Sequence, residues 1–170
     1  MGPTFTCILV ATDFGVESAA AFRSAVSLAR AVGASIHLLH VAKDPFLAVS
    51  TPELYGLDWT TLRDDITDEA QARLARLVNQ TGDVPIACDV RIGRAVETIV
   101  QAAEDVGADL IVMGTHGRGP LGHLLLGSVA EQVIRLADCP VMTVRDFGAV
   151  RIASGERVGA EHEAAGHVLV

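Results

Sequence analysis

Apolar positions along the chain fall into two kinds of segment that alternate from the N-terminus onward. Short runs rich in β-branched residues predict strands, over residues 7–11, 35–41, 86–92, 109–113 and 141–144. Longer segments with an apolar residue at every third or fourth position predict helices, over 17–33, 65–79, 94–106 and 128–137. Alternating strands and helices are typical of a parallel sheet with helices on both faces and right-handed crossovers.

The polarity of each run indicates where its strand lies in the sheet. The first run (CILVA) and the fourth (DLIVM) are dominated by apolar residues, as expected for central strands buried on both faces. From Ile86 to Ile92 the third run alternates strictly between apolar and polar residues, so we expect one wet face and a place near an edge. The first and fourth strands should therefore lie side by side.

Composition agrees with a single globular domain. The chain has 170 residues, of which 50% are hydrophobic and 20% charged, which suits one domain with a proper core. A net charge of −8 argues against nonspecific binding to DNA or RNA. No apolar run is long enough to predict a membrane span or a signal peptide. Cys7, Cys88 and Cys139 are odd in number and widely spaced, which favours free thiols in a reducing, cytoplasmic compartment.

Two segments lack clear periodicity. Residues 42–63 contain Pro45, Pro52 and Gly56 and predict a long loop, a kind of segment that often forms a functional lid. From residue 146 onward Gly, Ala, Glu and Arg are mixed with weak periodicity. We therefore expect one domain over 1–146 and an extension over 147–170, which is a hairpin, a partner-binding arm or a loose tail.

Candidate chemistry follows the two central strands, at the sheet edge where ligands bind in open parallel sheets. Thr12 and Asp13 follow the first strand. Gly114 follows the fourth and begins a glycine-rich loop that ends at Gly127, directly before the last helix at Ser128. Glycines let the backbone approach an anion and adopt positive φ, and the free N–H groups of a helix start favour phosphate. The sequence thus predicts a phosphate site, although glycines alone fit ordinary turns equally well.

Two familiar phosphate motifs do not fit this loop. Gly117, Gly119 and Gly122 spell GxGxxG, but Pro120 interrupts the run and the helix begins only near Ser128, whereas the dinucleotide motif turns straight into its helix. A Walker loop requires lysine after glycine, and the only lysine in the chain is residue 43. Neither class of nucleotide site is predicted.

The spacing of four loop residues carries a more specific signal. Gly114, Gly117, Gly127 and Ser128 fit the pattern G-x2-G-x9-G-[ST], in the context strand, loop, helix. This pattern resembles the ATP-binding subset of the universal stress protein family, and the resemblance extends over residues 5–145. Ala130 and Ala95 stand where family members often have Asn and Pro, so one polar contact differs.

The resemblance implies a Rossmann-like α/β three-layer sandwich with a five-stranded parallel sheet in the order 3-2-1-4-5. It also implies ATP, with Mg²⁺, as the ligand of a regulator or sensor in the stress response. Residues implied to line the adenine and ribose end are Thr12, Asp13 and Val41. Those implied around the ribose and phosphates are Met113, Gly114, His116, Gly117, Gly127, Ser128 and Val129, with Arg118 as a mobile cation.

The last predicted strand suggests a partner. Val141, Met142, Thr143 and Val144 are largely apolar on both faces, yet a fifth strand after the fourth should lie at an exposed edge. Pairing of two such strands in a symmetric homodimer covers that edge, as is common in the family. Alternatively, the C-terminal extension folds back over it. No nucleic-acid or membrane partner is expected. Whether the dimer has a further protein partner is left open by the sequence.

Two alternative functions remain open on the sequence alone. One is a stress protein that leaves the glycine loop empty and works through dimerisation and protein contacts. The other is a weak ATPase, in which Asp13 and His116 position water or metal, or a protein that phosphorylates itself at Ser128. No metal site is predicted, since His37 and His40 lie three apart in a strand and face opposite sides.

Overall fold

The computed structural model describes residues 5–44, 58–79, 81–115 and 127–145. Strands and helices alternate along the chain, as the hydrophobic pattern predicts. The strands are β1 (Cys7–Thr12), β2 (Ser35–Ala42), β3 (Ile86–Ile92), β4 (Leu110–Gly114) and β5 (Val141–Val144). The helices are α1 (Val16–Val32), α2 (Trp59–Val78), α3 (Ala95–Val106) and α4 (Ser128–Leu136).

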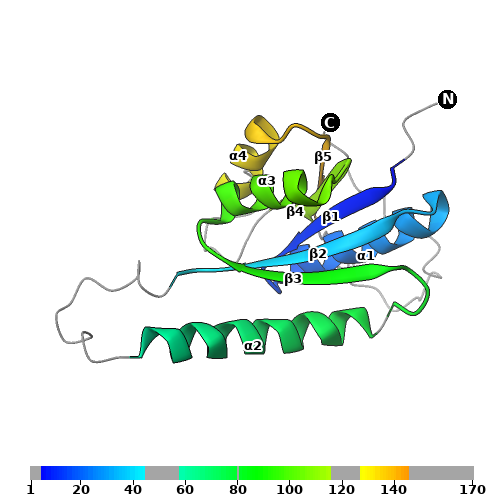
Figure 1. The fold of residues 1–170 in the computed structure, drawn as a ribbon. Coiled ribbons are helices and arrows are strands. Elements are labelled where there is room, and N and C mark those ends of the chain that lie inside the picture. The colour runs from blue at the N-terminus through cyan, green and yellow to red at the C-terminus, as the bar shows by residue number, and fades with distance from the viewer. Residues whose placement is uncertain (1–4, 45–57, 80, 116–126, 146–170) are drawn as a thin grey trace, which may run out of the picture.

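The five strands form one parallel sheet in the order β3-β2-β1-β4-β5, which confirms the predicted topology (Figure 1). In the centre of the sheet Ile8 of β1 pairs with Ile36 of β2 on one side and with Leu110 of β4 on the other. The alternating strand β3 and the short strand β5 lie at the two edges. The chain therefore reverses its strand order between β1 and β4, where open sheets of this kind bind ligands.

Helices cover both faces of the sheet (Figure 1). Alternate residues of the central strands point to opposite faces, so Ile8 and Val10 pack with α1 and α2, and Leu9 and Ala11 pack with α3 and α4. The residues of β1 from Ile8 to Ala11 are at most 8% exposed. This two-sided burial explains why the first run contains no polar residue.

Helix α2 begins at Trp59, earlier than the predicted start at residue 65. The cause is Asp58, whose side chain accepts hydrogen bonds from the backbone N–H groups of Thr60 (3.1 Å) and Thr61 (3.3 Å). Because this cap stabilises the first turn, the helix can begin before its apolar stripe does. The predicted loop over 42–63 is therefore wrong at its end, and its middle, 45–57, lies outside the described residues.

All three cysteines are free and partly buried. Burial is the main cause that raises the pKa of each thiol above its ordinary value. A raised pKa lowers the thiolate fraction, so these side chains are expected to be poor nucleophiles.

Across the parts of the chain that the structure describes, no helix combines the length and the apolarity that a membrane crossing requires.

Candidate functional site

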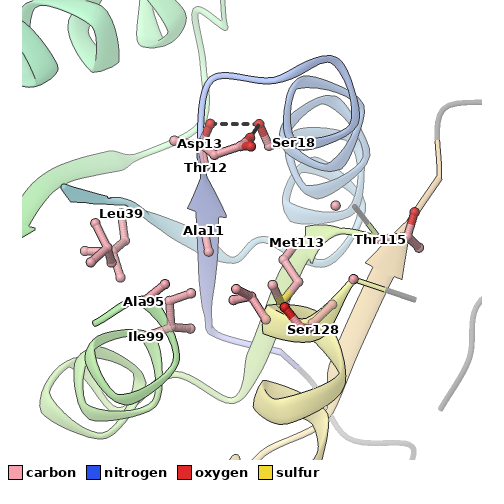
Figure 2. Close-up of a pocket in the computed structure, with 15 residues that line it drawn as sticks. Ala11, Thr12, Asp13, Ser18, Leu39, Ala95, Ile99, Met113, Thr115 and Ser128 are labelled. Atoms are coloured by element: carbon pink, nitrogen blue, oxygen red, sulfur yellow. Dashed lines mark hydrogen bonds between the residues drawn. The ribbon is translucent and has the colours of Figure 1, made fainter. Parts of the chain in front are cut away.

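A pocket of about 320 Å³ opens at the carboxyl edge of the sheet, around the ends of β1 and β4 (Figure 2). Its walls come from the ends of β1, β2 and β4 and from the first turns of α1, α3 and α4. The lining residues are Ala11, Thr12, Asp13, Ser18, Leu39, Val41, Ala95, Ile99, Met113, Gly114, Thr115, Gly127, Ser128, Val129 and Ala130.

Every predicted nucleotide-binding residue that the structure describes lines this pocket. These residues are Thr12, Asp13, Val41, Met113, Gly114, Gly127, Ser128 and Val129. The remaining three, His116, Gly117 and Arg118, lie outside the described residues. The structure thus brings together positions that are more than 100 residues apart in the sequence.

One side of the pocket is an apolar wall that the sequence reasoning missed in part. Leu39 comes from β2, and Ala95 and Ile99 come from α3 (Figure 2). Leu39 and Ile99 are 0% and 4% exposed, so they belong to the core as well as to the pocket. Their spacing in the sequence signals only a strand and a helix, because the pocket arises where the two meet. A wall of this kind suits a flat apolar ring.

The turn between β1 and α1 forms a polar corner of the pocket. Oδ1 of Asp13 accepts hydrogen bonds from the backbone N–H of Gly15 (2.9 Å) and from the hydroxyl of Ser18 (2.7 Å). The hydroxyl of Thr12 donates to Ser18 Oγ (3.2 Å) and accepts from the N–H of Phe14 (3.0 Å). These bonds fix the direction of the Asp13 carboxylate at the rim.

The same turn carries local strain. Phe14 has φ of 62°, the left-handed region that a bulky side chain seldom adopts. Such a conformation costs on the order of 1 kcal/mol and persists where surrounding contacts hold it. The centroids of the Phe14 and His40 rings lie 4.4 Å apart. The guanidinium carbon of Arg73, in α2, lies 4.1 Å from the centroid of the Phe14 ring. The Nδ1–H of His40 donates to the Thr12 carbonyl (2.7 Å).

The end of β4 is packed closely against the start of α1. A Cβ at Gly114 would lie 3.0 Å from the backbone carbon of Glu17 and from the nitrogen of Ser18, so only glycine fits without displacement. Beyond it, the Thr115 hydroxyl donates to Oε2 of Glu17 (2.6 Å), and the N–H of Gly127 donates to the Thr115 carbonyl (2.7 Å). Thr115 and Gly127, the residues on either side of 116–126, therefore meet at the pocket.

Helix α4 begins at the pocket without a side-chain cap. Its N-cap is Gly127, and Ser128 and Val129 of its first turn line the pocket. The first N–H groups of a helix have no partner within the helix, and the helix dipole adds partial positive charge there. This end of the pocket is suited to an anion.

The two described glycines of the motif do not have the expected positive φ, so this expectation is wrong for both. Gly127 has φ of −62°, and neither it nor Gly114 is among the positive-φ glycines of the described chain. Those are Gly33, Gly82 and Gly107, outside the pocket lining. Gly114 is needed for close packing instead, a cause that its place in the motif does not reveal.

Within the described ranges, no group of three or more His, Cys, Asp or Glu side chains is arranged to hold a metal ion.

Comparison with known proteins gives consistent results. The sequence model of the universal stress protein family matches residues 4–145. Universal stress protein MJ0531 of Methanocaldococcus jannaschii is 34% identical over 139 residues, which are 81% of this chain and 81% of that protein. The solved structure of MJ0577, from the same organism, superimposes with a TM-score of 0.74 at 29% identity, covering 86% of this chain and 100% of that one.

Structures of the same fold include two nucleotide complexes. One is a universal stress protein in complex with cAMP, with a TM-score of 0.58 at 24% identity, covering 84% of this chain and 98% of that one. The other is the universal stress protein from Archaeoglobus fulgidus in complex with dAMP, with a TM-score of 0.55 at 21% identity, covering 83% and 98%. At these identities the likeness concerns the fold. The family match and the relatives together show that the chain belongs to the universal stress protein family.

Proposed function

We propose that the protein binds an adenine nucleotide, ATP with Mg²⁺ in the first place, and acts as a nucleotide-dependent regulator or sensor in a cytoplasmic stress response. The observation that carries this proposal is one pocket that combines an apolar wall with an uncapped helix start. Leu39, Ala95 and Ile99 form the wall, and Gly127 and Ser128 begin the helix. Few ligand classes other than nucleotides pair an apolar ring with phosphates.

The ligand's orientation follows from the chemistry of the walls. The base packs against the apolar residues of β2 and α3, and the phosphates face the first turn of α4. The sugar then lies between them, near the polar corner at Asp13. An ionised carboxylate only accepts hydrogen bonds, so Asp13 suits a sugar hydroxyl better than a phosphate.

Coupling to a signal rests on residues 116–126, which connect Thr115 and Gly127 of the pocket lining. The hydrogen bond between Gly127 and Thr115 holds the two residues that flank 116–126 next to the proposed phosphate position. Occupancy of that position favours one loop arrangement over others, so the bound form presents a different surface to a partner.

Two further points concern the nucleotide and its metal ion. The cAMP and dAMP complexes indicate that this fold accommodates adenine nucleotides in other members of the family. In our proposal Mg²⁺ is carried by the nucleotide's phosphates, as is common for this ion, and not by a cage of protein side chains.

We propose in addition a homodimer formed through β5. This strand lies at the sheet edge, and its residues Val141 and Met142 are only partly buried. Thr143 and Val144 are 2% and 7% exposed, so their side chains already belong to the core of one chain. The dimer contact would therefore involve the backbone edge of β5 that no other described strand pairs with, together with the first two side chains.

The proposal predicts that the full chain co-purifies with a nucleotide. Heat release of purified protein should yield a compound that absorbs at the adenine maximum and has the mass of ATP, ADP or AMP. The same protein, once stripped, should rebind ATP from solution. A stripped, folded chain that binds no adenine nucleotide would show that the pocket serves another purpose.

A further inference from the structure

Ser18 is a buried hydroxyl in the pocket wall that no sequence motif marks. It lies in the first turn of α1 and is 4% exposed, yet it lines the pocket. Its hydroxyl accepts from Thr12 (3.2 Å) and donates to Oδ1 of Asp13 (2.7 Å), as Figure 2 shows. Three side chains thus form a chain of hydrogen bonds that ends on a carboxylate at the pocket rim.

A role confined to starting the helix is the simpler explanation. Ser18 Oγ also lies 3.1 Å from the carbonyl of Gly15, the N-cap residue of α1. The bond to Asp13 is shorter, and bonds to a charged acceptor are the stronger kind. A chain of hydroxyls that ends on a carboxylate also polarises each member in turn. The geometry therefore favours Asp13 as the acceptor of the hydrogen bond that the Ser18 hydroxyl donates.

We infer that Ser18 is a positioning residue, which holds the Asp13 carboxylate toward the sugar hydroxyls of the bound nucleotide. This inference rests on the proposed function. Oδ1 accepts hydrogen bonds from both Gly15 and Ser18, which restrains rotation of the Asp13 carboxylate. A fixed acceptor binds a hydroxyl with less loss of side-chain entropy than a mobile one.

A double-mutant cycle on the full chain tests the inference. ATP affinity is measured by calorimetry for wild type, Ser18→Ala, Asp13→Ala and the double variant, beside Ser27→Ala as a control. Ser27 lies on the same helix and is exposed, and its hydroxyl donates only to the Arg23 carbonyl. We expect Ser18→Ala to weaken ATP binding about tenfold, the size of one charge-assisted hydrogen bond. In the Asp13→Ala background the same change should alter affinity less than about twofold.

The analogue 2′,3′-dideoxy-ATP, which has no sugar hydroxyls, provides the second readout. Its affinity should be the same for wild type and Ser18→Ala, whereas a purely structural defect would weaken both nucleotides alike. If Ser18→Ala unfolds, Ser18→Cys can take its place, because a thiol fills the buried volume but is only a weak hydrogen-bond donor. It should show the same weakening of ATP binding.

Two kinds of result would contradict the inference itself. The first is an equal loss of ATP affinity from Ser18→Ala in the wild-type and Asp13→Ala backgrounds. An equal loss of affinity for ATP and for 2′,3′-dideoxy-ATP would contradict the inference in the same way. The second is a Ser18→Ala protein that binds ATP as tightly as wild type. A wild-type chain that binds no ATP would instead refute the proposed function, which keeps the two failures distinct.

Discussion

Two buried threonines, one at the end of β1 and one in β5, differ in how their hydroxyls are satisfied. Thr12 is 6% exposed, and its hydroxyl donates to Ser18 and accepts from the Phe14 N–H. Thr143 is 2% exposed, and its Oγ1 has no hydrogen-bond partner in the described part of the chain. A buried hydroxyl without a partner loses its hydration and gains nothing in return.

Replacing each threonine by valine should therefore shift stability in opposite directions. Thr143→Val removes an unsatisfied hydroxyl at nearly constant volume and should raise the free energy of unfolding by about 1 kcal/mol. Thr12→Val removes the hydroxyl that donates to Ser18 Oγ and accepts from the Phe14 N–H, and should lower the free energy of unfolding by about 1–3 kcal/mol. Urea denaturation of the two variants measures both values. A destabilised Thr143→Val chain would mean that its hydroxyl has a partner after all.

At the residue scale the sequence predicts which positions line the pocket better than it predicts why. Glycine spacing located Gly114 and Gly127, but the reason for Gly114 is the approach of Glu17, a contact 97 positions away. Ser18 and Ile99 could not be predicted, since a serine in a first helical turn and an isoleucine on a helix stripe both read as ordinary structure. Their role depends on where β1, α1 and α3 converge.

At the scale of elements, hydrophobic periodicity predicts most boundaries because burial determines them. The strands Ile86–Ile92 and Val141–Val144 match their predicted ranges. The start of α2 could not be predicted from periodicity, since a capping carboxylate at Asp58 fixes it and not an apolar stripe.

The edge of β5 offers a test of the proposed dimer that leaves the sheet intact. The carbonyls of Pro140 and Val144 accept from Ile111 and Thr115 in and beyond β4, so by strand alternation the N–H of Val141 points away from β4. Val141→Pro removes that outward donor and should convert the dimer to a monomer, read as mass by light scattering.

Val141→Ala is the matched control. Like Val141→Pro it removes the partly buried valine side chain, but it keeps the backbone N–H. It should remain a dimer. An unchanged mass for Val141→Pro in a folded chain would contradict pairing through β5.

At the scale of the whole molecule, the strand order and the site follow from the same feature. The two most apolar runs form the two neighbouring strands β1 and β4, and the strand order reverses between them. Residues at the carboxyl ends of these neighbouring strands necessarily meet at one edge of the sheet, which is why Asp13 and Gly114 share one pocket.

The most direct test of the account is a calorimetric titration of the stripped full chain with Mg·ATP, comparing wild type with Gly127→Glu. A carboxylate at the first turn of α4 places negative charge where the phosphates are proposed to lie, and should weaken binding at least about tenfold. Gln71→Glu, on the exposed surface of α2, adds the same charge away from the pocket and should bind like wild type. Saturable binding by wild type, lost only in Gly127→Glu, is the predicted result; equal ATP affinity in all three chains would contradict the assignment of this pocket.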